Sequence, residues 1–260
     1  MNPPTLEGAV KLADKVERGV AKLEVAELEN VDVVVAAPFV YLYPIRSLLK
    51  RVKLGAQDVF WAAPEGRASP RFAGRETAYT GEISVTQLKD LVVRYVIVGH
   101  SERRALGETE SRINKKLKVV LEAGMTAVLC VGEPQGTRDK GEEAAKEFVE
   151  SQIKADLDGI EGWKLENENL LIAYEPIWAV GTGNNAVPED AAKMISFIKS
   201  ILNSQFSILN SRVLYGGSTN AENIGGFMAR NEIDGALVGG VSLDAGEFVG
   251  MVKIAGGNHR

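Results

Sequence analysis

The feature that most constrains the fold of this chain is a repeat of short apolar runs, each followed by a polar turn and an amphipathic stretch. The runs are nearly continuous in apolar residues, which is typical of parallel strands buried on both faces. They predict seven strands, at residues 31–37, 53–57, 92–98, 126–131, 169–174, 211–215 and 234–238. The amphipathic stretches predict helices at residues 43–50, 84–90, 108–123, 138–156, 188–206, 219–229 and 242–254. This alternation indicates an α/β fold built on a parallel sheet with right-handed crossovers.

The chain opens with MNPPTLEGAVKLADKVERGV, which predicts a helix that no predicted strand precedes. Pro3 and Pro4 stand at its start, where a missing N–H is tolerated because the first turn leaves that group unpaired anyway. Apolar residues then recur three and four positions apart up to Val20. This spacing forms one apolar face of a helix.

Polar residues and glycines directly follow most of the predicted strands: Gln57, Asp58, Gly99, His100, Glu133, Glu175, Gly216 to Ser218, Gly239 and Gly240. Polar side chains that follow successive strands are typical of the C-terminal face of a barrel. The alternative, a doubly wound open sheet, would carry G-x-G-x-x-G after an early strand, and no such motif is present there. The sequence therefore predicts a TIM (β/α)8-type barrel with seven readable strands and the first strand missing. No linker divides the chain, so we expect a single domain over residues 1–260.

Composition excludes several classes of function. The net charge is −5 and the basic residues are scattered, which argues against nucleic acid as a partner. The apolar runs are too short to cross a bilayer, and the first residues show no secretory pattern. The single cysteine, Cys130, fits a cytoplasmic protein, and we expect a buried structural thiol. With two histidines a His-rich metal site is not available, so we predict no metal.

Two residues that directly follow predicted strands are candidates for acid–base chemistry. In LLIAYEPIW, Glu175 follows a buried strand, where apolar surroundings raise the pKa of a carboxyl group toward that of a useful base. In VIVGHSERRALGE, His100 precedes a short helix start with Ser101 as a cap, and the N–H groups of such a start favour a neutral imidazole. The alternatives are an exposed glutamate in an ordinary loop and a histidine that satisfies its own turn.

The loop that follows Glu175 has the composition of a lid. It combines a rigid proline start, a large aromatic residue and two glycines, which suits a loop that closes as a unit over a ligand. We call residues 176–183 the lid loop; its members are Pro176, Ile177, Trp178, Ala179, Val180, Gly181, Thr182 and Gly183.

Two glycine clusters follow the last two predicted strands. YGGSTNAENI contains Gly216, Gly217 and Ser218, and ALVGGVSLDAGEF contains Gly239 and Gly240. Backbone N–H groups at a helix start, which a ligand approaches closely because glycine has no side chain, bind phosphate. Barrels often build a phosphate pocket at these two strands. The pair of clusters therefore predicts a small phosphorylated substrate.

Seven segments resemble, in the same order, signatures of the triosephosphate isomerase family: GAQDVFW, AYTGEIS, VGHSERR, VLCVGE, AYEPIWAVGTG, YGGSTNAEN and DGALVGG. The resemblance implies a TIM barrel that interconverts dihydroxyacetone phosphate and glyceraldehyde 3-phosphate, in glycolysis and gluconeogenesis, without a metal or other cofactor. It implies that Glu175 is the base that moves the proton. It also implies that His100 is the neutral electrophile that binds the substrate oxygens at the enediolate stage.

The resemblance assigns supporting roles as well. Ser101 and Glu102 support the catalytic pair, and residues 176–183 form the lid. The N–H groups that hold the substrate phosphate are assigned to Gly181, Ser218, Gly239 and Gly240. The family's loop after the third barrel strand inserts into a neighbouring subunit. Here that loop, at residues 62–77, is extended, so we expect a homodimer with an altered loop contact.

The family begins with a strand that ends in a Gly-Asn-Trp-Lys type motif, whose lysine balances the charge of the substrate. This sequence starts directly after the place of that motif. Three explanations compete: the sequence begins at an internal methionine of a longer protein, the shortening is natural, or the tail takes the place of the strand. The tail, residues 255–260, ends in Gly-Asn-His-Arg, but it is short for a turn and a strand. Without the lysine we expect impaired turnover, and the alternative function is a catalytically weak or inactive barrel that binds a phosphorylated metabolite.

Overall fold

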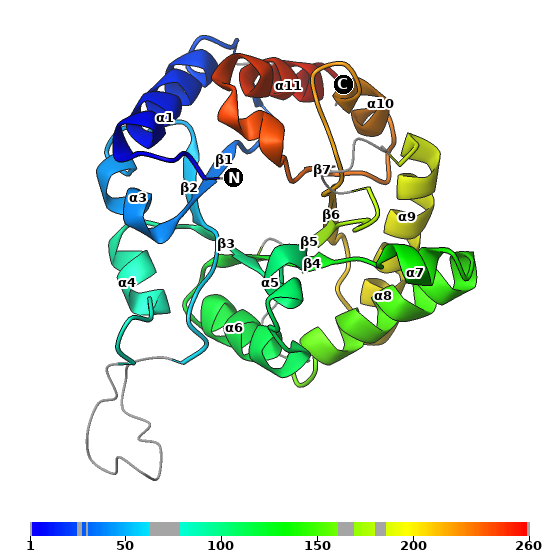
Figure 1. Cartoon of the computed structure of the whole chain (residues 1–260). Coiled ribbons are helices and arrows are strands. Elements are labelled where there is room, and N and C mark those ends of the chain that lie inside the picture. The colour runs from blue at the N-terminus through cyan, green and yellow to red at the C-terminus, as the bar shows by residue number, and fades with distance from the viewer. Residues whose placement is uncertain are drawn as a thin grey trace.

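A computed structural model describes residues 2–24, 28–29, 31–62, 79–160, 169–179 and 186–258. Among these residues, seven strands form one parallel sheet in which the spatial order is the sequence order. The strands are β1 (Val34–Ala37), β2 (Lys53–Ala56), β3 (Tyr95–Val98), β4 (Thr126–Val131), β5 (Leu170–Tyr174), β6 (Arg212–Tyr215) and β7 (Gly235–Ala236). Figure 1 shows the sheet curled at the centre of the molecule, with helices around its outside. The prediction of seven parallel strands in a curled α/β fold is confirmed.

The helices follow the strands in alternation. They are α1 (Leu6–Val20), α3 (Phe39–Ile45), α4 (Val85–Asp90), α5 (Ser101–Ala105), α6 (Glu110–Glu122), α7 (Gln135–Arg138), α8 (Glu142–Asp156), α9 (Pro188–Phe206), α10 (Ile224–Met228), the 3-10 helix η2 (Gly240–Leu243) and α11 (Ala245–Asn258). Local sequence explains several starts. Thr5 caps α1 through the N–H of Gly8, Ser84 and Gln87 form a capping box at α4, and Pro188 occupies the first position of α9.

Several predicted boundaries are wrong for local reasons. The helix predicted at 43–50 lies earlier, at Phe39–Ile45, and ends just after Pro44. The helix predicted at 138–156 is two helices, because Gly141 between them has φ of +109°, a conformation outside the helical region. The strand predicted at 234–238 is reduced to Gly235–Ala236. By contrast, the strand at 126–131 and the helix at 188–206 have their predicted bounds.

The central strands β4 and β5 are buried on both faces, as their continuous apolar runs predict. Along β4, Ala127, Leu129 and Val131 belong to the large core cluster that includes the buried faces of the helices. The intervening residues Val128 and Cys130 belong to a separate small cluster with members from β3, β5 and β6. Successive side chains of a strand point to opposite faces, so the first set packs outward against helices and the second fills the interior of the curl.

The sheet has free edges at β1 and β7. Within the described ranges no strand pairs with either of these edges on its open side. On the outside, α1 and α11 lie side by side, as Figure 1 shows in blue and red. Their close approach depends on Gly19, where an added Cβ would lie 2.6 Å from Cγ2 of Val249.

The structure tests the expectation about the tail but not the one about the extended loop. Of the extended loop at 62–77, residues 63–77 lie outside the described residues. The hypothesis that the tail forms a strand is wrong for residues 255–258, because they continue α11 as a helix. Across the part of the chain that the structure describes, no helix has both the length and the apolar character of a membrane span.

Burial predicts a sharp contrast between two leucine truncations. Leu117 on α6 is fully buried in the core, whereas Leu209 is 55% exposed. Leu117→Ala should lower the free energy of unfolding by about 2–5 kcal/mol, because it removes buried methyl groups and leaves a cavity. Leu209→Ala should change it by about 0.5 kcal/mol or less. Urea unfolding of both variants measures the difference, and equal effects would contradict the described packing of α6.

Candidate active site

Glu175 and His100 are brought together from the ends of two strands. Glu175 directly follows β5 and is 2% exposed, and His100, separated from β3 by Gly99, is the N-cap of α5. The Nε2 atom of His100 lies 3.0 Å from Oε1 of Glu175. The second carboxylate oxygen, Oε2, accepts a hydrogen bond from the backbone N–H of Ser101 at 2.9 Å. The two residues selected from the sequence for acid–base chemistry are therefore direct partners.

The surroundings of His100 define where its proton lies. The backbone N–H of Glu102 donates to Nδ1 of His100 at 3.3 Å, so Nδ1 is an acceptor and the neutral ring carries its proton on Nε2, toward Glu175. Burial lowers the pKa of His100, but the hydrogen bond and the charge of Glu175 outweigh burial, and the pKa is raised above its usual value. The carboxylate of Glu102 lies 3.9 Å from Nδ1 and raises the pKa further.

Two glycines leave space for Glu175. An added Cβ on Gly132 would lie 1.7 Å from the carbonyl oxygen of Glu175, and one on Gly216 would lie 2.8 Å from its Cγ. Any side chain at either position would displace the carboxylate. Gly216 belongs to the first glycine cluster of the sequence, but its contact with Glu175 across β5 and β6 has no signal in the local pattern.

A second buried carboxylate, Glu133, holds the start of the lid loop. Its side chain is fully buried after β4, and Oε1 accepts hydrogen bonds from the Trp178 indole N–H at 2.9 Å and the Tyr174 hydroxyl at 3.1 Å. Burial and then Glu133 raise the pKa of Tyr174, so this hydroxyl remains a donor. The other oxygen of Glu133 has no hydrogen-bond partner among the described atoms.

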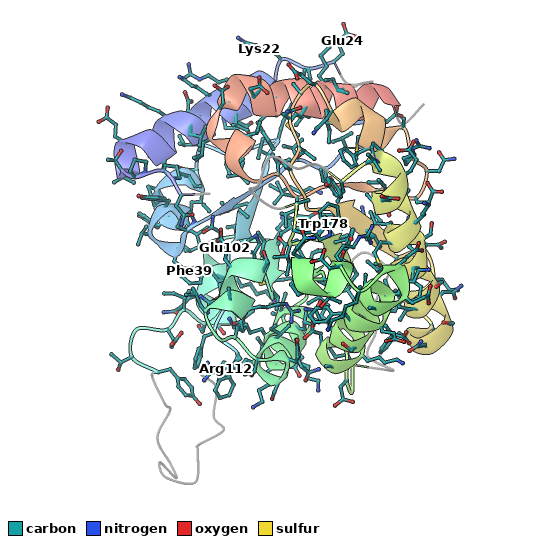
Figure 2. The ribbon with its side chains drawn as sticks, turned by 45° about the vertical axis from the view of Figure 1, so that its right-hand side comes forward. Lys22, Glu24, Phe39, Glu102, Arg112 and Trp178 are labelled. Carbon is teal, nitrogen blue, oxygen red and sulfur yellow. The ribbon has the colours of Figure 1, made fainter. Side chains whose placement is uncertain are left out.

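The structure describes some of the remaining predicted site residues and not others. The lid loop is described from Pro176 to Ala179, and Val180, Gly181, Thr182 and Gly183 lie outside the described residues. Gly239 and Gly240 are exposed at the start of η2, which follows β7. Ser218 follows β6, and its carbonyl accepts a hydrogen bond from Asn223 at 3.3 Å. Figure 2 labels Glu102, whose side chain is 80% exposed, and Trp178.

Sequence analysis placed Glu133 among the polar residues that follow strands but gave it no role, and it did not single out Arg104. Glu133 follows a buried strand as Glu175 does, so a polar residue after β4 was the available signal. Arg104 on α5 donates to the carbonyl of Gly99 beside His100, and the SERRA segment alone gives no signal for that contact. Cys130 is fully buried and burial raises its pKa well above the usual value, which confirms the expected buried thiol.

No group of three or more His, Cys, Asp or Glu side chains could hold a metal ion among the residues that the structure describes. The polar groups at the site are the carboxylate of Glu175, the imidazole of His100 and the backbone N–H of Ser101. This set is suited to moving a proton and to binding an anionic oxygen.

The raised pKa of His100 can be tested through its cause. Glu175→Gln removes the charge that raises it, so burial should dominate and the pKa should fall. Glu102→Gln should lower it less, because that carboxylate is exposed and 3.9 Å away. NMR titration of the imidazole measures both values, and an unchanged pKa in Glu175→Gln would contradict the described pairing. In the wild type this contribution to stability is present below a pH of about 6.5 and is lost as the pH rises through the folded-state pKa.

A family model described as triosephosphate isomerase matches residues 2–255. The chain is 43% identical over 232 residues to a triosephosphate isomerase of Dictyoglomus thermophilum, which covers 86% of each chain. It is 44% identical over 210 residues to that of Thermus thermophilus, covering 79% of this chain and 78% of the relative. It is 40% identical over 240 residues to that of Dehalococcoides mccartyi, covering 90% and 87%. With this similarity along nearly its whole length, the chain belongs to the triosephosphate isomerase family.

Proposed function

We propose that this chain interconverts dihydroxyacetone phosphate and glyceraldehyde 3-phosphate, with Glu175 as the base and His100 as the electrophile. The observation that carries the proposal is the contact of 3.0 Å between Nε2 of His100 and Oε1 of Glu175 at the ends of β3 and β5. A base and a hydrogen-bond donor on one side of a small substrate are what an aldose–ketose isomerisation needs. Membership of the family supports the same reaction.

The contacts of Glu175 would have to change when a substrate binds. Both oxygens of Glu175 are engaged, one by Ser101 N–H and one by His100. To reach a substrate carbon the carboxylate has to leave these partners, which frees the Nε2–H of His100 for the substrate oxygens. Substrate binding therefore changes the partners of both residues at once.

The reaction then follows from the two side chains. Glu175 takes a proton from the carbon beside the carbonyl, the electron pair of that C–H bond forms the carbon–carbon double bond, and the carbonyl oxygen becomes anionic. His100 donates a hydrogen bond to this oxygen. The hydroxyl proton on the neighbouring carbon then passes, by way of His100, to the anionic oxygen. Glu175 returns its proton to the former carbonyl carbon, and a new carbonyl forms where the hydroxyl was. Both side chains end in their starting protonation states.

The lid and phosphate roles remain part of this proposal. The hydrogen bond from Trp178 to Glu133 fastens the start of the lid loop, and closure over a substrate would exclude water from the enediolate. Backbone N–H groups near Ser218, Gly239 and Gly240, with that of Gly181, would hold the phosphate. Support for this placement comes from the strand order, since β6 and β7 are neighbours and the glycine clusters follow them.

The base is tested by a conservative substitution. Glu175→Gln keeps the size of the side chain and removes its basicity, so kcat for glyceraldehyde 3-phosphate should fall by about 10²- to 10⁴-fold. Glu143→Gln, whose side chain is 83% exposed on α8, should leave kcat unchanged. A coupled assay of both variants and the wild type measures the effect. Binding of a triose-phosphate analogue without turnover by the wild type would instead support the weak or inactive phosphate-binding barrel.

We also propose that the chain forms a homodimer. Three large apolar side chains are exposed after the first and third described strands: Val40 and Tyr43 on α3 at 74% and 67%, and Leu106 after α5 at 83%. Large apolar side chains exposed to water favour burial against a partner subunit. The altered contact expected at 62–77 falls largely outside the described residues.

The dimer is tested by placing charge on this surface. Tyr43→Arg should shift the protein from dimer to monomer in sedimentation velocity, because an interface cannot easily bury an unpaired charge. Val187→Arg, at a side chain 53% exposed beside α9, should leave the mass unchanged. A wild-type protein that sediments as a monomer at micromolar concentration would contradict the proposal.

A further inference from the structure

Arg104 binds backbone carbonyls on two neighbouring strands. It lies on α5, and its Nε donates to the carbonyl oxygen of Gly99 at 2.7 Å. That carbonyl belongs to the peptide that joins Gly99 to His100. The Nη2 atom of Arg104 donates to the carbonyl of Cys130 on β4 at 2.9 Å. One guanidinium group therefore ties the turn that carries His100 to the adjacent strand.

The same strand end anchors Glu175. Val131 follows Cys130, and its carbonyl accepts the backbone N–H of Glu175 at 2.8 Å. Two consecutive carbonyls of β4 thus hold the two sides of the site: that of Cys130 holds Arg104, and that of Val131 holds Glu175. A shift of Arg104 would change the position of the His100 turn relative to Glu175.

The turn itself is fitted to the arginine. Gly99 has φ of +71°, in the left-handed region that glycine adopts without strain. An added Cβ there would lie 3.0 Å from Nη2 of Arg104 and 3.2 Å from side-chain atoms of Ile113. The peptide that precedes His100 therefore has little freedom to rotate while the guanidinium is in place.

Two carboxyl groups hold the guanidinium. Oδ2 of Asp156, which is fully buried on α8, lies 2.6 Å from Nη2, and Glu110 on α6 pairs with Nη1. Burial raises the pKa of Asp156 to about 8, and Glu110 raises it as well, whereas Arg104 lowers it. Arg104 is itself only 12% exposed, so it cannot turn to solvent without leaving these groups unpaired.

We propose that Arg104 is a positioning residue for the isomerase reaction: it orients His100 through the Gly99 carbonyl and fixes the His100 turn against the strand end that holds Glu175. The inference rests on the proposed function and deepens it. Arg104 acts through the backbone and touches no reacting atom. The planar fork of an arginine donates in several fixed directions at once, whereas the ammonium of a lysine is a single point.

Arg104→Lys tests the role because it keeps the positive charge beside Asp156 and loses the fork. We expect kcat to fall by about 10- to 100-fold, since a displacement of about 1 Å at a catalytic group costs up to about 10²-fold. KM should change by less than about threefold, because the phosphate-binding segments follow other strands. Arg103→Lys is the matched control on the same helix. Arg103 pairs with Asp58 at 3.0 Å and Glu108 at 3.6 Å, and its substitution should leave kcat within about twofold.

A second measurement does not depend on turnover. The chain has two histidines, His100 and His259, so the imidazole ¹⁵N signals of His100 can be assigned from the spectrum of His259→Asn. In the wild type, at a pH above the folded-state pKa of His100, Nδ1 should show the signal of a nitrogen without a proton. In Arg104→Lys that signal should shift or broaden as His100 samples other orientations, whereas Arg103→Lys should leave it unchanged.

The outcomes separate the two proposals. If Arg104→Lys lowers the melting temperature but changes neither kcat nor the His100 signals, Arg104 has only a structural role and the inference is overturned. If the wild type shows no turnover, the proposed function fails, and the ¹⁵N signals still decide whether Arg104 orients His100.

Discussion

The backbone hydrogen bonds that continue the parallel ladder beyond the strand ends determine where the site lies. The N–H of Glu175 donates to the carbonyl of Val131, and that of Gly216 donates to the carbonyl of Tyr174, each at 2.8 Å. These bonds keep successive chain segments at strand spacing after regular pairing has ended. The residues that follow β4, β5 and β6 are thereby held close to one another. Gly132 and Gly216 are required by the same closeness, since each would place a Cβ against Glu175.

Main-chain atoms also hold the two side chains that we propose as catalytic. Ser101 N–H engages Glu175, and Glu102 N–H engages His100, both from the first turn of α5. Such donors point at the site because the first turn of a helix has no internal partners for them. The five-residue α5 is therefore important for its start rather than for its length. Glu133, by contrast, uses its side chain to hold the start of the lid loop through Trp178.

The sequence predicted those features that depend on nearby residues. The strand at 126–131 and the helix at 188–206 were predictable because composition and periodicity change abruptly at their ends. Glu175 and His100 were predictable because each directly follows a buried run. The role of Glu133 and the importance of Arg104 were not predicted, because their partners, Trp178 for the first and Asp156 for the second, lie 45 and 52 positions away. The short β7 was overestimated because an apolar run does not show how many of its residues find a ladder partner.

The contact between α1 and α11 joins the first and last described units of the curled sheet. Between the first and last described units, the connection is made by helix packing on the outside, where Gly19 admits Val249, and not by strand pairing on the inside. Side-chain packing tolerates small sliding movements, whereas a hydrogen-bonded ladder fixes register. The contact between α1 and α11 can therefore slide slightly, whereas the paired side chains of Glu175 and His100 lie where the ladder from β3 to β5 is continuous.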